Sequence, residues 1–229
     1  MPARSFIQAL IPQALDRYVR KKMRPIQVRH APPKLTQGEA QNYWTAPPDE
    51  KNAPDRYAAA DIERSASLLA LLDRLVKKDA AVLEIGCNAG RNLNHLFHNG
   101  FANLSAIEIS PAAIAHFGMT FPDTAKAVDV KIGSLEQILP TIPDKRFDVL
   151  FSMAVMMHIH PDSAFVFSHM VRVSKIVLAI EDERESTSTR HFGRNYREIF
   201  EALGAKQILE EYPVAGLNEC TARAFECPN

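Results

Sequence analysis

Residues 81–93 read AVLEIGCNAGRNL, and this stretch decides the fold. An apolar run reaches Glu84 and Ile85, passes through a turn that holds Gly86 and Gly90, and enters a helix. This order is typical of a buried parallel strand followed by a helix whose free N–H groups point at a ligand. The stretch therefore predicts a ligand-binding turn at the carboxyl end of a central strand.

A second acidic residue follows about one helix later. Residues 104–109 form another short apolar run, and Glu108 lies near its end. A carboxylate at that place can accept both hydroxyl hydrogens of a ribose, as it does in dinucleotide-binding folds. The turn and Glu108 together predict a cofactor that contains adenosine.

The glycine pattern narrows the kind of cofactor. A dinucleotide fingerprint needs Gly-x-Gly-x-x-Gly, so that backbone and helix can close on a pyrophosphate. This turn has only Gly86 and Gly90, with Asn88 between them and Arg91 after the second. Asn is the least costly replacement for glycine where the backbone needs a positive φ. An NAD-linked oxidoreductase is therefore disfavoured, although it stays as an alternative.

Strands and helices alternate on both sides of this turn. The hydrophobic periodicity and the turn residues predict strands at 81–85, 104–109, 127–132, 147–153, 175–181, 206–212 and 220–227 and helices at 61–78, 90–99, 111–118, 134–139, 162–173 and 193–203. Such alternation predicts the α/β class, with a doubly wound, mostly parallel seven-stranded sheet and helices on both faces. Ligands bind such sheets beyond the carboxyl ends of the strands.

The N-terminal part has a different character. Residues 4–22 have apolar residues at helical spacing and many basic ones, and residues 31–57 are rich in proline. We expect an amphipathic helix and an irregular connector, which form a helical extension over residues 1–60 and partly cover a domain over 61–229. The helix either rests on an anionic membrane, closes over an acidic substrate, or packs on the domain with its charges in solvent.

Composition sets further bounds. The 27 Lys and Arg balance the 27 Asp and Glu, but residues 1–30 hold seven basic residues and only one acidic residue. No broad basic face is indicated, so a nucleic-acid partner is not favoured. No segment approaches the ~20 apolar residues that span a bilayer, and the N-terminus does not resemble a signal peptide. Cys87, Cys220 and Cys227 form neither a disulfide framework nor a metal motif, which predicts a reducing cytoplasm.

The stretch from Glu84 to Gly90 resembles motif I of the class I S-adenosylmethionine-dependent methyltransferases, and the similarity continues over about residues 80–180. That family usually has a third glycine where Asn88 stands. The resemblance implies that the turn backbone lies against the methionine part of S-adenosylmethionine and that Glu84 reaches its amino group. The residues of this turn and of the helix start assigned to the cofactor are Glu84, Gly86, Cys87, Asn88, Gly90, Arg91 and Asn92, of which Arg91 and Asn92 meet the carboxylate.

The resemblance also assigns the adenosine half of the cofactor. It implies that Glu108 binds the ribose and that Ile109 presses on one face of the adenine. Ser134 stands where the family usually has an Asp that receives the exocyclic amine, and Ser134 with the Leu135 backbone takes that role here. Ser152, in a segment like the fourth-strand motif of the family, offers its carbonyl oxygen to the cofactor amino group.

Two histidines follow the fourth predicted strand. Many small-molecule methyltransferases of this class have a His near the position of His158, close to the transferred methyl. An imidazole titrates near working pH, so His158 or His160 can remove a proton from the nucleophile. The alternatives are local packing and a metal bound by the two histidines, and no third ligand is evident for a metal.

Aromatic and basic residues flank this region. Those that we expect to meet the methyl acceptor are Tyr43, Trp44, Arg190, His191, Arg194 and Tyr196. The guanidinium groups favour a carboxylate or phosphate on that acceptor. The alternatives are that the aromatic residues anchor the connector and that the charges are solvated.

The sequence as a whole predicts an S-adenosylmethionine-dependent methyltransferase, a transferase of EC class 2.1.1 type that moves a methyl group to oxygen or nitrogen of a small metabolite. No Asn/Asp-Pro-Pro-Tyr motif of base or glutamine N-methylation is present, and no strand-end Asp of the metal-dependent catechol type. A methyltransferase-like subunit without turnover is the second alternative. The sequence does not specify the acceptor or the oligomeric state.

Overall fold

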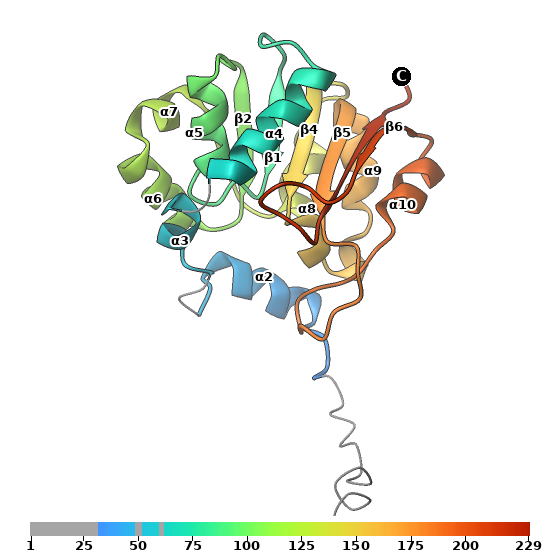
Figure 1. The fold of residues 1–229 in the computed structure, drawn as a ribbon. Coiled ribbons are helices and arrows are strands. Elements are labelled where there is room, and N and C mark those ends of the chain that lie inside the picture. Colours follow the sequence, from blue (N-terminus) through green and yellow to red (C-terminus); the bar gives the residue numbers. More distant parts are fainter. Residues whose placement is uncertain (1–31, 49–51, 60–61) are drawn as a thin grey trace, which may run out of the picture. The chain divides into compact units, whose positions relative to one another are not determined.

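The computed structural model describes residues 32–48, 52–59 and 62–229. The predicted helix over residues 4–22 lies outside the described residues. Residues 33–229 form one compact unit, which is coloured by sequence in Figure 1.

Seven strands form one sheet in the order β3-β2-β1-β4-β5-β7-β6. The first five strands along the chain pair in parallel, and β7 runs antiparallel to both of its neighbours. The predicted mostly parallel, seven-stranded sheet is therefore confirmed. The strands are β1 (Val82–Ile85), β2 (Leu104–Glu108), β3 (Asp129–Ile132), β4 (Phe147–Met153), β5 (Ser174–Glu181), β6 (Lys206–Glu211) and β7 (Thr221–Glu226).

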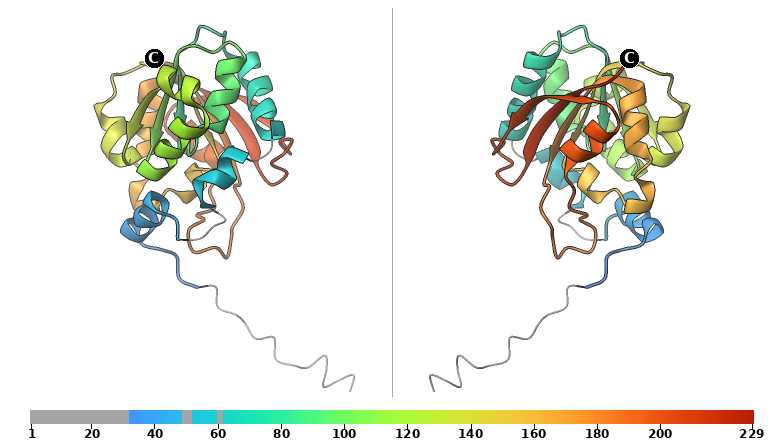
Figure 2. Two further views of the ribbon diagram at one scale, coloured as in Figure 1. Left: turned by 90° about the vertical axis from the view of Figure 1, so that its left-hand side faces the viewer. Right: turned by 90° about the vertical axis from the view of Figure 1, so that its right-hand side faces the viewer.

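Helices cover both faces of the sheet, as the two edge-on views of Figure 2 show. Side chains alternate between the faces along each strand, so Val82 and Leu83 of β1 belong to different apolar clusters. One cluster includes residues of α4 (Ile62–Leu75), α5 (Arg91–His98) and α6 (Pro111–Thr120), and the other includes residues of α9 (Val166–Val173) and α10 (Tyr196–Ala202). The remaining helices after β2 are α7 (Pro122–Ala127), α8 (Leu135–Ile138), η2 (Leu139–Thr141), η3 (Met156–His158) and η4 (Pro161–Ser163).

Local signals explain where several helices begin. Ser110 caps α6 by accepting a hydrogen bond from the N–H of Ala113 at 3.3 Å, and Pro111 takes the first helical position. Asn195 caps α10 in the same way, so this helix begins at Tyr196 rather than at residue 193. The helix predicted over 162–173 is divided into η4 and α9.

The prediction of an irregular connector over residues 31–57 is wrong for the described part of that range, which is largely helical. It contains α2 (Gln37–Thr45) and α3 (Pro54–Ala59). Few apolar residues mark α2, so its periodicity is weak, but Thr36 and Glu39 form a reciprocal capping box that starts it. Pro54 begins α3. Proline is tolerated at this first position because the backbone N–H that it lacks would have no partner inside the helix.

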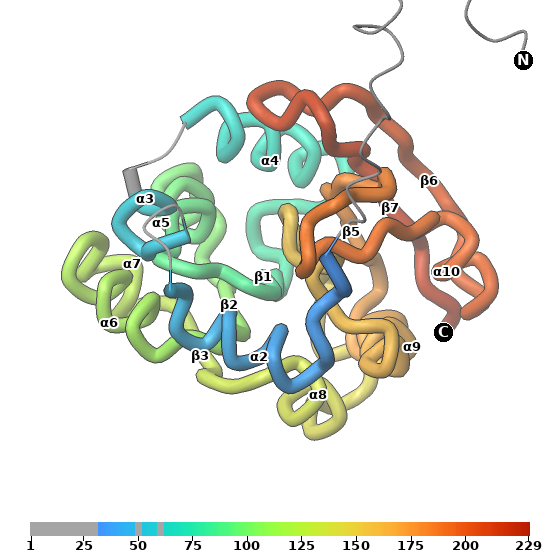
Figure 3. Tube along the Cα trace, turned by 90° about the horizontal axis from the view of Figure 1, so that it is seen from below, coloured from blue at the N-terminus to red at the C-terminus, as the bar shows by residue number. Residues whose placement is uncertain are grey.

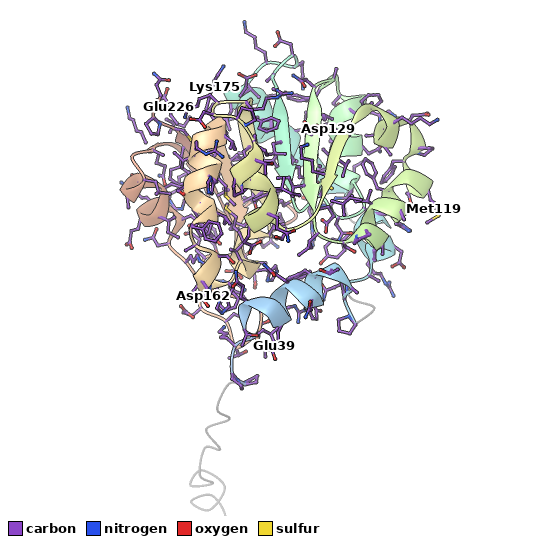
Figure 4. All side chains as sticks on the ribbon, turned by 180° about the vertical axis from the view of Figure 1, so that it is seen from behind. Glu39, Met119, Asp129, Asp162, Lys175 and Glu226 are labelled. Atoms are coloured by element: carbon purple, nitrogen blue, oxygen red, sulfur yellow. The ribbon has the colours of Figure 1, made fainter. Side chains whose placement is uncertain are left out.

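Helix α2 lies beyond the carboxyl ends of the parallel strands. Figure 3 views the sheet from this end, with α2 in blue crossing in front of it. Figure 4 labels Glu39 of α2 and Asp162 at this end, and labels Asp129, which opens β3, and Lys175 near the start of β5 at the opposite end. The helix thus covers the edge where a doubly wound sheet binds ligands.

Candidate functional site

A cavity of about 420 Å³ lies at the carboxyl ends of β1, β2 and β4. This volume is in the range of small-molecule sites, about 300–1,000 Å³. Its walls come from the turn after β1, the ends of β2 and β3, η3, α2 and the loop of residues 182–195. The predicted site residues that line it are Trp44, Glu84, Gly86, Cys87, Asn88, Arg91, Asn92, Glu108, Ile109, Ser134, Leu135, His158, His160, Arg190 and His191.

The turn after β1 has positive φ angles at Gly86, Asn88 and Gly90, as its glycine and asparagine residues suggest. Asn88 has a φ of 47°, in the left-handed region, and its side chain accepts a hydrogen bond from the N–H of Ala89 at 2.8 Å. Gly90 has a φ of 74° and caps α5, and a Cβ there would approach the ring of Phe117 to 2.2 Å. Gly90 is therefore beneath the turn rather than among the lining residues, and it lets the turn pack on α6.

Glu84 is buried beside the start of α5. Its Oε1 accepts a hydrogen bond from the side chain of Asn92 at 2.8 Å, whereas its buried Oε2 has no hydrogen-bond partner among the described residues. Burial raises the pKa of Glu84 to about 8, and the Asn92 hydrogen bond and the Arg91 charge oppose that shift. An unpartnered buried carboxylate oxygen is costly unless a donor reaches it. Glu84 therefore suits a cationic group in the cavity.

Glu108 is held by the backbone of two different loops. One carboxylate oxygen accepts from the N–H of Asn88 and the other from the N–H of Ser110, each at 2.8 Å. Burial raises the pKa of Glu108, and these backbone hydrogen bonds oppose the shift. The residue is only 6% exposed, so its carboxylate is not a solvated charge at the end of a strand. Its orientation toward the cavity is fixed by the turn itself.

The adenine-side residues lie where β2 and β3 end. Ile109 follows β2, and Ser134 and Leu135 begin α8, all three along the cavity wall. Ser134 makes no capping hydrogen bond with its side chain. Its hydroxyl is thus not used to start the helix.

The loop after β4 is organised by Glu181, which we did not select from the sequence. Glu181 ends β5 and is completely buried. Its carboxylate accepts hydrogen bonds from the Ser152 hydroxyl and from the N–H groups of Val155, Met156 and Met157, the last three at 3.1–3.2 Å. Burial raises the pKa of this carboxyl, and the hydrogen bonds counteract that. Glu181 thereby fixes the segment that leads to His158.

The same contact changes the interpretation of Ser152. This residue is completely buried and is not among the cavity-lining residues, because its side chain turns to Glu181. The next two residues, Met153 and Ala154, line the cavity instead. The predicted strand is confirmed as β4, while the role expected for the Ser152 carbonyl oxygen stays a prediction.

His158 faces the cavity in a defined state. Its Nδ1 lies 2.8 Å from the carbonyl oxygen of Arg190, so Nδ1 carries the proton and Nε2 has a free lone pair. Burial lowers the pKa of His158 to about 4, and the charges of Arg190 and His191 act in the same direction. The imidazole is therefore neutral at pH 7. The indole of Trp44 packs against it with ring centroids 4.5 Å apart.

His160 is engaged in local structure. Its Nδ1 accepts a hydrogen bond from the N–H of Asp162 at 3.1 Å and so caps η4. Its ring also packs edge-on against Phe192. In residues 32–48, 52–59 and 62–229 no three His, Cys, Asp or Glu side chains gather as a metal site would require.

A lysine fastens two distant segments over the cavity. The ammonium group of Lys34 donates to the carbonyl oxygens of Ser186, Ser188 and His191 at 2.6–3.0 Å. The N–H of Leu35 adds a bond to the Thr189 carbonyl at 2.8 Å. The loop of residues 182–195 is thereby joined to the start of α2, and both contribute to one wall.

Three of the expected acceptor residues lie behind that wall. Tyr43 accepts a hydrogen bond from Asn52 and lies under the guanidinium of Arg190. Arg194 donates to the carbonyl oxygens of Met156, Ile159 and Phe192, so it supports the loop after β4. Tyr196 is 1% exposed and packs on Phe167. None of the three lines the cavity, whereas Trp44, Arg190 and His191 do.

The fold and the cavity define a doubly wound α/β domain with a candidate ligand site at the carboxyl edge of its sheet. Residues 83–176 match the family model described as a methyltransferase domain. This part of the chain is therefore similar to methyltransferase domains. This match favours methyl transfer over the NAD-linked alternative.

Solved structures show the same fold. The 4+2 cyclase SpnF has a TM-score of 0.65 at 14% identity, with 86% of this chain and 98% of that chain covered. Magnesium protoporphyrin IX methyltransferase from Synechocystis PCC 6803, with bound S-adenosylmethionine, has a TM-score of 0.64 at 12% identity, covering 84% and 97%. A methyltransferase in complex with the Trm112 activator of Haloferax volcanii has a TM-score of 0.60 at 15% identity, covering 79% and 98%.

No curated protein sequence matches the chain. In the part of the chain that the structure describes, no helix is long and apolar enough to cross a membrane.

Gly90 provides a test of the turn. Gly90→Ala should lower the free energy of unfolding by about 1–2 kcal/mol, because an L residue is strained at this φ, and the new methyl also meets Phe117. Gly118→Ala is the matched control, since a Cβ there has open space in α6 and should stabilise by about 0.5–1 kcal/mol. Urea denaturation measures both, and equal effects would contradict the geometry.

Glu84 predicts a pH dependence of stability. The folded pKa of about 8 exceeds the usual glutamate value of 4.5, so between these two pH values the folded protein holds a proton that the unfolded chain releases. Stability from this group is complete below the lower value and is lost as pH rises toward 8, by about 1.4 kcal/mol for each pH unit. Glu84→Gln should remove that part of the slope. Denaturation midpoints at several pH values check this, and parallel curves for both proteins would refute it.

Proposed function

We propose that this chain transfers the methyl group of S-adenosylmethionine to an oxygen or nitrogen of a small molecule held beside His158. The observation that carries the proposal is that Glu84 lines the cavity while its buried Oε2 lacks a partner among the described residues. An amino acid ammonium group would satisfy it. The enzyme would be a transferase of EC class 2.1.1 type. We also propose that it works in the cytoplasm, because Cys87, Cys220 and Cys227 are all free thiols.

The residues present fit this cofactor along the whole cavity. Glu84 would hold the ammonium, and Arg91 and Asn92 at the start of α5 would meet the carboxylate. The carboxylate of Glu108, held in place by backbone N–H groups, would accept hydrogen bonds from the ribose hydroxyls. Ile109, Ser134 and Leu135 would enclose the adenine. When bound, the cofactor supplies an electrophilic methyl group on a sulfonium.

His158 would manage the proton of the acceptor. Its Nε2 lone pair would take the proton that the nucleophile of the acceptor loses on methylation. The Arg190 carbonyl then stabilises the resulting imidazolium through Nδ1. A positioned base contributes about 10²–10⁴-fold to the rate. Alignment of the acceptor contributes up to about 7–11 kcal/mol.

The N-terminal elements would complete the site. Helix α2 covers the cavity, and Gln37 joins it to Ser163, whose hydroxyl donates to Glu136. A covered cavity excludes water from the methyl group. We propose that residues 1–60 act as a cap on the domain of residues 61–229, with the part before residue 32 outside the described structure.

Cofactor binding tests the proposal directly. Calorimetry of the full chain should detect S-adenosylmethionine and S-adenosylhomocysteine but not NADH. Glu108→Ala should weaken the binding of S-adenosylhomocysteine by about tenfold or more, because two hydrogen bonds to a carboxylate are lost. Glu219→Ala, at an exposed carboxylate, should leave it unchanged. Binding of NADH, or no heat with either adenosyl compound, would refute the proposal.

His158 can be tested separately from the cofactor. His158→Ala should lower turnover by about 10²-fold or more and leave the affinity for S-adenosylhomocysteine near that of the original protein. With the pKa of His158 at about 4, turnover should not change with the ionisation of His158 between pH 6 and pH 8. The release of S-adenosylhomocysteine with a panel of acceptors measures turnover. Undiminished turnover in the variant would assign the proton to another group.

A further inference from the structure

We propose that the methyl acceptor carries an oxyanion, a carboxylate or a phosphate monoester, which Arg190 receives together with the ring N–H groups of Trp44 and His191. This inference rests on the proposed function, because it names the class of molecule that occupies the acceptor end of the same cavity. All three side chains line the cavity.

Arg190 is the cation of this end. Its guanidinium lies over the ring of Tyr43 at 4.4 Å and near that of Trp44 at 5.7 Å. Such stacking uses the flat face of the group, whereas its five N–H donors lie in its plane and point outward. In the described part of the chain these donors have no hydrogen bond or ion pair. The planar fork of an arginine matches a carboxylate or a phosphate with two parallel hydrogen bonds.

Two buried nitrogens beside it also lack partners. Nε1 of Trp44 and Nε2 of His191 are buried and make no hydrogen bond with any described residue. His191 is only 6% exposed, and its ring lies 6.3 Å from that of His158. The indole N–H can only donate, and a buried donor without an acceptor costs about 1–3 kcal/mol. An oxygen-rich group at this end would satisfy both.

The acidic side chains around this end are already engaged. Asp182 binds the guanidinium of Arg184 through both oxygens at 2.8 Å. Glu136 accepts a hydrogen bond from Ser163, and Glu84 and Glu108 belong to the opposite, cofactor end. The positive charge of Arg190 is thus uncompensated within the described structure. A neutral or cationic acceptor would leave the positive charge of Arg190 uncompensated.

The wall also holds these groups still. Lys34 bonds to the carbonyl oxygen of His191, and the Arg190 carbonyl accepts from His158. An anion bound by Arg190 would therefore lie next to the proposed base. This arrangement places the reacting oxygen or nitrogen a short distance from the anionic group of the same molecule.

The experiment uses the full chain saturated with S-adenosylhomocysteine and titrated with benzoate, phenyl phosphate and benzamide. At least one anion should bind about tenfold more tightly than the neutral, isosteric benzamide. Arg190→Gln should abolish this preference without changing the affinity for S-adenosylhomocysteine. Trp44→Phe, which keeps a ring but removes one N–H, should weaken the anion several-fold. Whichever anion binds distinguishes the carboxylate from the phosphate.

Arg197→Gln is the matched control, because Arg197 pairs with Glu201 on the exposed side of α10. It should keep the full anion preference. The inference is overturned if no anion binds, if benzamide binds equally well, or if the two arginine variants behave alike. A loss of S-adenosylhomocysteine affinity in Arg190→Gln would reassign Arg190 to the cofactor and also overturn it. If S-adenosylhomocysteine fails to bind the original protein, the proposed function fails, and the same titrations without it judge the anion site separately.

Discussion

Three carboxylates are buried near the carboxyl ends of β1, β2 and β5, and the site depends on how each is satisfied. A buried carboxylate is stable only with donors around it. Glu108 takes its donors from the turn after β1 and from Ser110, and Glu181 takes four from Ser152 and the loop after β4. Glu84 takes only one from protein, the Asn92 amide. The first two acids shape the loops, while the third keeps an oxygen for a ligand.

The cavity is consequently polarised from end to end. Glu84 and Glu108 line the part where a cation and a ribose would lie, whereas Arg190, Trp44 and His191 line the other part. His158 lies between the arginine loop and η3 in its neutral form. In the proposed reaction, the methyl group would pass between these two environments. Because the two parts of the cavity differ in charge, a cationic group would favour the part with Glu84 and an anionic group the part with Arg190.

The sequence predicts the cavity-lining residues after β1 and β2 better than those of α2 and of the loop after β5. The strand–turn–helix at residues 81–93 and the acid at Glu108 are local patterns, and both lie along the cavity as their spacing suggests. Glu181 shows the same signal, an acid that ends an apolar parallel strand, but its partner Ser152 becomes a neighbour only through the pairing of β4 with β5. Tyr43, Arg194 and Tyr196 were indistinguishable from Trp44 and Arg190 by composition. Only tertiary contacts separate those that face the cavity from those that support it.

The Lys34 contacts have a consequence for how the two halves form. The cofactor half comes from a single run of chain between residues 84 and 135, whereas the other wall joins residue 34 to residues 186–191. Closing so long a loop carries an entropic cost that local structure does not share. During synthesis the wall that joins Lys34 to residues 186–191 can form only after most of the chain has been made. The part of the cavity beside Arg190 is thus the last that the nascent chain completes.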